Sequence, residues 1–286
     1  MKGIILAGGS GTRLHPLTSI TSKQLLPVYD KPLIYYPLST LISLGIDEIL
    51  VISNPNQINL FEQLLGNGKK FGISLSYEVQ IMPNGIAEAL LIGEKFLGSD
   101  NCCLILGDNI FVSNIFQPSL VENFTLGAKV FTSKVKDPER YGVLELDELG
   151  TPKRLIEKPE SFISNDAVTG LYFYDNQAPS FCKDLTPSSR GEIEITDLNN
   201  IYLQKKMMSV TCLDETSAWL DAGTFTSLHD AASYIQSMQR RIGAPVGSPE
   251  YAALKNLFID SDSLLRTLDS APKNDYYSML KKALGN

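Results

Sequence analysis

The sequence predicts an α/β protein whose central, mostly parallel sheet is covered by helices on both faces. Short apolar runs alternate with helical patterns through the first half of the 286-residue chain. These runs are continuous rather than alternating, as expected of parallel strands that are buried on both faces. The composition, with 43% hydrophobic and 20% charged residues, is that of an ordinary globular protein.

The first half follows a strand–helix order. Strands are predicted at 3–7, 48–53, 74–80 and 102–106, and helices at 35–44, 57–65 and 86–96. From residue 128 the pattern changes, with strands at 128–135, 142–146, 155–157 and 168–174 and few long helices between them. We expect these strands to add to the same sheet in mixed or antiparallel fashion.

The last third is predicted to be largely helical. A helix at 194–204, a strand near 210–213 and a helix at 224–241 are followed by a break at residues 243–249, where glycine and proline alternate. We therefore expect an α/β core over residues 1–241. Residues 242–286 should form a helical extension packed on that core.

Composition and charge exclude several classes of protein. The net charge of −7 argues against a nucleic-acid partner and an anionic membrane surface. No apolar stretch approaches the roughly 20 residues that cross a bilayer, and the N-terminal apolar run is too short for a signal peptide. The four cysteines show no metal-binding spacing with the two histidines, so we expect reduced, mostly buried thiols and a cytoplasmic protein.

A glycine-rich loop, Gly8–Arg13, follows the first predicted strand directly. It lacks the Lys-Ser or Lys-Thr pair of a P-loop and the third glycine of the dinucleotide fingerprint. An ordinary turn is the plainest alternative, because glycine readily adopts positive φ. Three glycines with Ser10, Thr12 and Arg13 exceed what a turn needs, since successive backbone N–H groups form an anion nest and Arg13 adds a bidentate donor. The loop is predicted to hold phosphate groups.

Asp108 follows another predicted strand, at 102–106. In open α/β sheets, ligands bind beyond the carboxyl ends of the strands, so the glycine loop and Asp108 are expected to share one site. Taken alone, Asp108 is equally compatible with a turn, and Asp221 with the cap of the helix predicted from Thr224.

Residues 6–14 (LAGGSGTRL) and 22–28 (SKQLLPV) together resemble the signature of the sugar-1-phosphate nucleotidylyltransferases. Further segments narrow the resemblance to members that use dTTP and glucose 1-phosphate: 35–38 (YYPL), 106–109 (LGDN), 137–143 (DPERYGV), 157–159 (EKP), 168–175 (VTGLYFYD), 191–197 (GEIEITD) and 219–224 (WLDAGT). No single segment carries the match, which runs over nearly the whole chain.

This resemblance implies a single Rossmann-like three-layer α/β domain with a mixed, mostly parallel sheet, antiparallel additions and a helical C-terminal extension. It also implies that the first half of the core at residues 1–241 binds the nucleotide and the second half binds the sugar. It also implies a Mg²⁺-dependent reaction of dTTP with α-D-glucose 1-phosphate that gives dTDP-glucose and pyrophosphate. That reaction is an early step towards dTDP-L-rhamnose or related dTDP-sugars and polysaccharides. A homotetramer is implied as well, with the nucleotide-sugar product as a feedback ligand at a second site.

The site must bring two polyanions together, and each pair of like unit charges at ~4 Å costs on the order of 4 kcal/mol at an effective dielectric of about 20. Cations and alignment are therefore the main requirements. The resemblance assigns catalytic roles to Arg13, Lys23 and Lys158. It assigns magnesium binding to Asp108 and Asp221, because Mg²⁺ takes one or two carboxylates together with substrate phosphates.

The remaining assignments concern the two substrates. Nucleotide binding falls to Leu6, Gly8, Gly9, Gly11, Thr12, Gln24, Gln80 and Gly85, and sugar-phosphate binding to Gly142, Glu157, Lys158, Val168 and Tyr172. Gln24 and Gln80 are candidate readers of the base, because an amide side chain both donates and accepts. Gly142 would leave room for a hydroxymethyl group, and Tyr172 would cap the sugar ring.

The sequence departs from the family pattern beside the base pocket. The usual Pro-Asp-Gly-Leu-Ala-Gln is here 83–88 (PNGIAE), so Asn84 and Glu88 change charge in opposite directions. UTP and other hexose 1-phosphates therefore remain alternative substrates. A catalytically silent relative is disfavoured, because Arg13, Lys23, Asp108, Lys158 and Asp221 are all present, and a nicotinamide-dependent dehydrogenase is disfavoured by the missing glycine.

Overall fold

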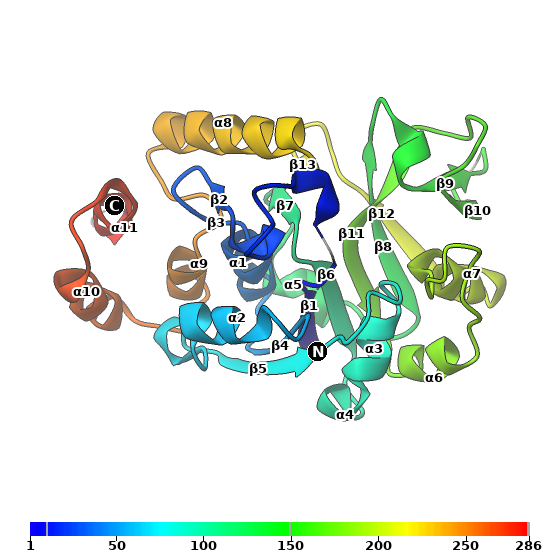
Figure 1. Cartoon of the computed structure of the whole chain (residues 1–286), viewed down its shortest axis with the longest axis horizontal. Coiled ribbons are helices and arrows are strands. Elements are labelled where there is room, and N and C mark those ends of the chain that lie inside the picture. The colour runs from blue at the N-terminus through cyan, green and yellow to red at the C-terminus, as the bar shows by residue number, and fades with distance from the viewer. Residues whose placement is uncertain (10, 149, 285–286) are drawn as a thin grey trace.

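A nine-stranded mixed sheet runs through the part of the chain that the computed structural model describes, residues 1–9, 11–148 and 150–284 (Figure 1). Its strands are β1 Lys2–Leu6, β4 Glu48–Ser53, β5 Ser74–Val79, β6 Cys102–Leu106, β8 Ala128–Lys134, β9 Gly142–Leu146, β10 Pro152–Glu157, β11 Asp166–Tyr174 and β12 Met208–Cys212. The path runs β10-β9-β11-β6-β1-β4-β5, with β8 on β11 and β12 on β8.

The parallel half confirms the strand–helix order predicted for the N-terminal region. Strands β5, β4, β1 and β6 lie side by side and point the same way. Ile5 faces a core shared with helices α1 (Tyr35–Ser43) and α2 (Ile58–Leu65). Ile4 faces the opposite core with α3 (Glu88–Ile92) and α7 (Ile195–Gln204). Alternate residues of one strand thus pack against two helical layers, which explains why the apolar runs are continuous.

The second half adds the antiparallel strands. Strand β11 runs antiparallel to β6, β8 and β9, and β10 closes the sheet antiparallel to β9. Strand β12 returns parallel to β8. The helix predicted at 86–96 is divided at Gly93 into α3 and α4 (Glu94–Leu97). A Cβ at Gly93 would lie 2.6 Å from Ile4 Cδ1, so the glycine lets this segment approach the sheet closely.

Several short elements were not predicted from the sequence, because two to six residues carry too little periodicity. These are the hairpin β2 (Pro27–Val28) and β3 (Lys31–Pro32), the paired strands β7 (Asn109–Val112) and β13 (Ala218–Asp221), and helices α5 (Pro118–Glu122) and α6 (Ala178–Lys183). Single 3₁₀ turns lie at Thr12–Leu14, Lys23–Leu25, Lys69–Phe71 and Pro138–Arg140. The β7–β13 pair matters most, because it joins two segments of the site.

The C-terminal third is helical. Helix α8 (Phe225–Ile242) begins at a capping box formed by Thr224 and Ser227 and ends at Gly243. Helix α9 (Pro249–Lys255) packs against α1 and contributes Ala252 and Ala253 to the core. Helices α10 (Ser261–Ser270) and α11 (Asp275–Leu284) form a smaller cluster at the left of Figure 1.

Most of the cysteines are buried, as predicted. All four are free thiols, with Cys102, Cys103 and Cys182 buried and Cys212 exposed. Burial raises the pKa of the Cys182 thiol to about 12 and that of Cys103 well above its ordinary value. In the described part of the chain, none of the helices combines the length and apolar character needed to cross a membrane.

Candidate active site

The glycine loop leaves the carboxyl end of β1 and crosses the top of the sheet. Gly9 and Gly11 adopt φ values of 95° and 59°, which favour glycine. A Cβ on Gly8 would lie 2.7 Å from Gln80 Oε1, so glycine lets the loop lie close to this side chain. Ser10 lies outside the described residues. The Thr18 hydroxyl donates to the Gly11 carbonyl oxygen at 2.7 Å and ties the loop to the segment that follows.

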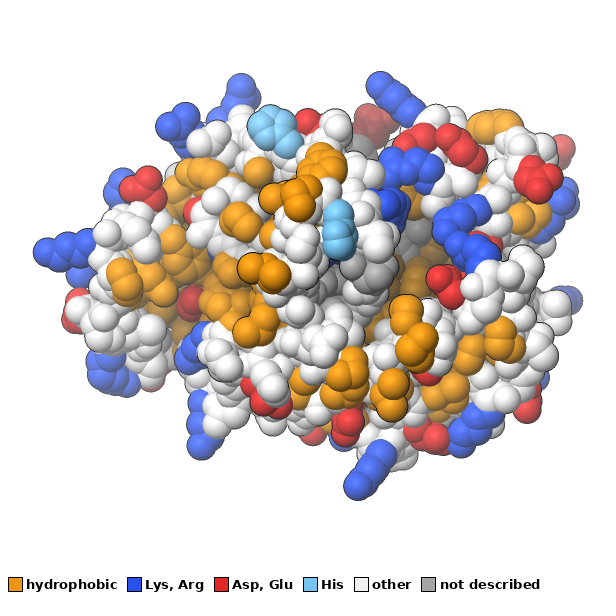
Figure 2. All heavy atoms as spheres, viewed as in Figure 1, with side chains coloured by type: hydrophobic (Ala, Val, Ile, Leu, Met, Phe, Trp, Pro, Cys, Tyr) orange, Lys and Arg blue, Asp and Glu red, His pale blue; other side chains and the backbone are white. Residues whose placement is uncertain are grey.

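Two adjoining cavities open beside this loop in the described structure. The glycine-loop cavity, of about 270 Å³, is lined by Gly8, Gly9, Gly11, Thr12, Arg13, Leu14, Lys23, Pro83, Glu192 and Gly223. The carboxylate cavity, of about 340 Å³, is lined by Arg13, Asp108, Asp221, Gly142, Glu157, Lys158, Val168, Tyr172 and neighbouring side chains. Arg13 lines both. Figure 2 shows this face hollowed, with basic and acidic side chains around the hollow.

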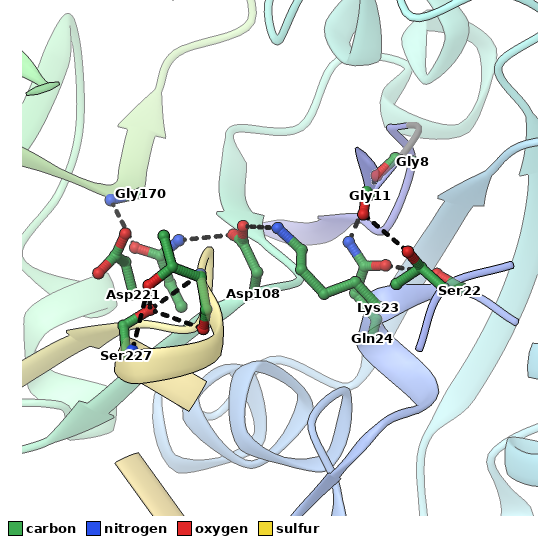
Figure 3. Close-up of polar contacts among 12 residues, drawn as sticks. Gly8, Gly11, Ser22, Lys23, Gln24, Asp108, Gly170, Asp221 and Ser227 are labelled. Atoms are coloured by element: carbon green, nitrogen blue, oxygen red, sulfur yellow. Dashed lines mark hydrogen bonds and ion pairs between the residues drawn. The ribbon is translucent and has the colours of Figure 1, made fainter. Parts of the chain in front are cut away.

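Lys23 and Asp108 form an ion pair at the junction of the two cavities (Figure 3). Lys23 begins the 3₁₀ turn Lys23–Leu25, and Asp108 lies in the turn between β6 and β7. The other Asp108 oxygen accepts a hydrogen bond from Asn109 Nδ2 at 2.8 Å. Burial alone would raise the pKa of Asp108, but the Lys23 ammonium and these hydrogen bonds outweigh it and lower that pKa.

Asp221 reaches the same cavity from the far end of the chain. In the β7–β13 ladder, Asp221 lies opposite Asn109, and the Ala222 N–H donates to the Asp108 carbonyl oxygen at 3.1 Å. Asp221 Oδ2 accepts from Arg140 at 3.2 Å. Burial raises the pKa of the Asp221 carboxyl, Arg140 opposes this rise and the charge of Asp108 adds to it. Thr224, rather than Asp221, caps α8, so the helix-cap alternative is wrong.

The two carboxylates fit a magnesium ion. Among the described residues no group of three or more His, Cys, Asp or Glu side chains is placed to hold a metal. Mg²⁺ needs fewer, because one or two carboxylates suffice when substrate phosphates and water supply the other oxygens. Asp108 and Asp221 lie on adjoining backbone segments, face one cavity and here hold the cationic groups of Lys23 and Arg140. The site is therefore already arranged to bind positive charge.

The predicted sugar-phosphate residues all line the carboxylate cavity. Glu157 accepts from Thr196 Oγ1 at 2.7 Å and pairs with Arg190 at 3.3 Å. Lys158 follows at φ 45°, with its backbone N–H donating to the Tyr141 carbonyl oxygen. A Cβ on Gly142 would lie 3.2 Å from Glu157 Oε2, so glycine keeps this wall open. Val168 and Tyr172 complete the wall from β11.

The candidate base readers lie beside and beneath the loop rather than on the walls of the two cavities. Gln24 Nε2 donates to the Gly8 carbonyl oxygen at 3.3 Å, and Gln24 Oε1 accepts from the Ser22 hydroxyl. Gln80 Nε2 donates to the Gly85 carbonyl oxygen at 3.2 Å. Two other residues predicted to bind the nucleotide are Gly85, which has a φ of 111°, and Leu6, which is the last residue of β1.

Sequence reasoning missed several polar groups that organise the site. Asn109 Oδ1 accepts from the Gly170 N–H at 3.1 Å and from Trp219 Nε1 at 2.5 Å, which turns its amino group towards Asp108. Arg140 and Arg190 hold Asp221 and Glu157 respectively. Asn109, Arg140 and Trp219 belong to the segments that carried the resemblance, but only the β7–β13 pairing and the turn at Pro138–Arg140 bring them together.

The chain is similar to known proteins over most of its length. Residues 2–238 match the family model described as nucleotidyl transferase. The glucose-1-phosphate thymidylyltransferase of Neisseria meningitidis is 51% identical over 286 residues, 99% of each chain, and that of Mycolicibacterium smegmatis is 49% identical over 99% of each. A Bacillus anthracis structure described by the same activity, with sucrose bound, is 43% identical, with a TM-score of 0.76 over 82% of this chain and 94% of its own.

A UDP-glucose pyrophosphorylase solved with UDP-glucose is 24% identical to this chain. It aligns with a TM-score of 0.72 over 83% of this chain and 98% of its own. At that identity the likeness concerns the fold alone: a mixed α/β sheet with antiparallel additions, as the sequence predicted.

Proposed function

This chain belongs to the nucleotidyl transferase family and, within it, to the glucose-1-phosphate thymidylyltransferases; from that premise we propose that it joins dTTP and α-D-glucose 1-phosphate to give dTDP-glucose and pyrophosphate. The observation that carries the proposal is the pair of adjoining cavities, one lined by the glycine loop and one by the sugar-side residues, which share Arg13 and meet at the Lys23–Asp108 pair.

The reaction is a displacement at the α-phosphorus of dTTP. A non-bridging oxygen of the sugar phosphate forms the new bond to that phosphorus, and the bond from the α-phosphorus to the oxygen bridging to the β-phosphate breaks. Pyrophosphate leaves with the bridging oxygen and its electron pair. The nucleophile is already an anion, so the protein need not supply a general base. Its tasks are to align the two substrates and to offset their charge.

Three cationic side chains suit these tasks. Arg13 is placed at the edge that the two cavities share, and none of the described carboxylates pairs with it within 4.0 Å, so its guanidinium is available to the β- and γ-phosphates. Lys23 leaves Asp108 for the α-phosphate as substrate enters. Lys158 receives the sugar phosphate, while Glu157 accepts hydrogen bonds from sugar hydroxyls.

Magnesium is the proposed cofactor, held by Asp108 and Asp221. When bound, it neutralises phosphate charge and polarises the α-phosphate. Lys23 pairs with Asp108 and Arg140 pairs with Asp221, so each carboxylate already faces a positive charge. Asn109 fixes Asp108 from the other side, so that this carboxylate needs little reorientation.

The neighbourhood of the base leaves UTP as the second nucleotide candidate, because uracil and thymine present the same hydrogen-bonding edge. Other hexose 1-phosphates are the corresponding alternatives on the sugar side. We further propose, from the family relationship, a cytoplasmic homotetramer that binds its nucleotide-sugar product as a feedback ligand. A nucleic-acid or membrane partner is not part of this proposal.

A substrate matrix tests the proposal. The protein is incubated with Mg²⁺ and each combination of dTTP or UTP with glucose, galactose or mannose 1-phosphate, and pyrophosphate release is measured. We expect the highest rate with dTTP and glucose 1-phosphate, and none when EDTA is added or either substrate is omitted. Absence of release with every pair, from protein that unfolds cooperatively on heating, would remove the enzymatic function.

A further inference from the structure

The side-chain amide of Gln80 has its amino end towards Gly85 and Glu88 and its oxygen towards the glycine loop. The residue is 4% exposed and follows β5 directly. Its Nε2 donates to two acceptors, the Gly85 carbonyl oxygen at 3.2 Å and Glu88 Oε2 at 2.7 Å. Its Oε1 points towards Gly8, where an added Cβ would come within 2.7 Å of it. The acceptor end of the amide is therefore the end that faces the glycine loop.

Glu88 determines this orientation together with the Gly85 carbonyl oxygen. An ionised carboxylate only accepts hydrogen bonds, so the amino end of the Gln80 amide must face it. The other Glu88 oxygen accepts from Asn84 Nδ2 at 2.8 Å. Asn84, Glu88 and Gln80 thus form a chain in which each donor meets an acceptor. Asn84 is exposed, Glu88 is half-buried at the start of α3 and Gln80 is buried.

We propose that the Asn84–Glu88 pair is a specificity-determining element, which acts by fixing the Gln80 amide so that its oxygen faces the base of the nucleotide. This inference rests on the proposed use of the glycine-loop cavity by a pyrimidine nucleoside triphosphate. Glu88 and Asn84 are positioning residues, because they act through Gln80. The Gln80 oxygen is the group that meets the base.

The fixed orientation selects the hydrogen-bonding edge of the base. Thymine and uracil carry an N3–H donor, which the Gln80 oxygen can accept. Cytosine has an unprotonated N3, whose lone pair would face that oxygen. Discrimination of this kind is strong when a buried polar group of the site would be left unpaired. The pair therefore separates dTTP and dUTP from dCTP, and it does not separate dTTP from dUTP.

Two double variants at positions 84 and 88 give opposite expectations. In Asn84→Asp/Glu88→Gln, the carboxylate introduced at position 84 accepts from the side-chain amino group at position 88. The side-chain oxygen at position 88 then faces Gln80, as a Glu88 oxygen does in the parent. In Asn84→Lys/Glu88→Gln, the ammonium donates to that oxygen and turns the amino group of residue 88 towards Gln80. The first arrangement preserves the Gln80 orientation and the second opposes it.

Binding of dTTP, dCTP and dUTP to the full chain with Mg²⁺ is measured by titration calorimetry. We expect Asn84→Asp/Glu88→Gln to keep the parent ratio of dTTP to dCTP affinity, and Asn84→Lys/Glu88→Gln to lower it by about tenfold. The ratio of dTTP to dUTP should stay constant in both. Comparing ratios removes the effect of the added charges, because dTTP and dCTP carry the same triphosphate.

Glu88→Met is the second test, since it deletes the acceptor and should also lower the dTTP to dCTP ratio. Glu94→Met is its matched control, because Glu94 pairs with Lys183 on the surface. The inference is overturned if the dTTP to dCTP ratio is unchanged in folded Asn84→Lys/Glu88→Gln or in folded Glu88→Met. It is also overturned if the parent protein does not prefer dTTP over dCTP. Nucleotide binding is independent of turnover, so a parent that prefers dTTP but forms no dTDP-glucose would refute the proposed function and leave this inference standing.

Discussion

Replacing Asp108 by Asn removes one of the two carboxylates proposed to hold magnesium while preserving the shape of the side chain. In the parent, one Asp108 oxygen contacts Lys23 and the other accepts from Asn109. The Asn side chain can keep one of these contacts but brings no charge. The substitution therefore tests the electrostatic role of Asp108 more than its packing.

The size of the effect follows from the charges involved. A unit charge and a divalent ion at ~4 Å, with an effective dielectric of about 20, attract each other by roughly 8 kcal/mol, twice the value for two unit charges. Substrate phosphates and retained water compensate for about half of this. A net loss of about 3–4 kcal/mol in transition-state stabilisation corresponds to a fall of roughly 10²–10³ in kcat.

Initial rates of pyrophosphate release are measured over a range of Mg²⁺ concentrations, with both substrates saturating. We expect Asp108→Asn to lose activity as calculated and to require more Mg²⁺ for half-maximal rate. Asp137→Asn is the matched control, because Asp137 pairs with Arg140 at 2.6 Å beside the site but does not line the carboxylate cavity. If Asp108→Asn stays within about tenfold of the parent with an unchanged Mg²⁺ requirement, Asp108 does not hold the ion.

Three further outcomes are expected. Asp221→Asn should abolish turnover yet raise the thermal midpoint at pH 7, because the raised pKa of Asp221 means that its ionised form destabilises the fold. This gain in stability should vanish below about pH 4, where the carboxyl is protonated in both the folded and the unfolded state. Scanning calorimetry at the two pH values checks this outcome. Lys158→Met should raise the KM for glucose 1-phosphate by about tenfold with little change in that for dTTP, in steady-state kinetics. A thiol reagent at pH 8 should label Cys212 rapidly and the buried Cys102, Cys103 and Cys182 only after unfolding, as followed by mass spectrometry.

Much of the fold follows from the sequence, because its strands are long and apolar. Strands β4, β6 and β9 have the predicted boundaries. The β7–β13 pair could not be predicted from local periodicity, since each strand has four residues and they lie more than 100 residues apart. This pairing places Asp221 beside Asp108. From the sequence, the proximity of these two carboxylates could be predicted only from the family resemblance.

The polar contacts of the site could likewise be predicted only where they depend on local sequence. Arg13 and the glycines were identified from chemistry, because anion nests depend on local sequence. The partners of Glu157 and Asp221, which are Arg190 and Arg140, come from loops whose conformation depends on tertiary packing. The Glu88–Gln80 contact explains a departure from the family pattern that the sequence alone could only note.

The most direct test of the two-substrate site follows the oxygen atoms. Glucose 1-phosphate labelled with ¹⁸O in its three non-bridging phosphate oxygens is incubated with dTTP, Mg²⁺ and the protein, and the products are analysed by ³¹P NMR and mass spectrometry. Attack of the sugar phosphate on the α-phosphorus predicts dTDP-glucose that contains the full label, together with unlabelled pyrophosphate. Label in the pyrophosphate, or no dTDP-glucose from folded protein, would contradict the account.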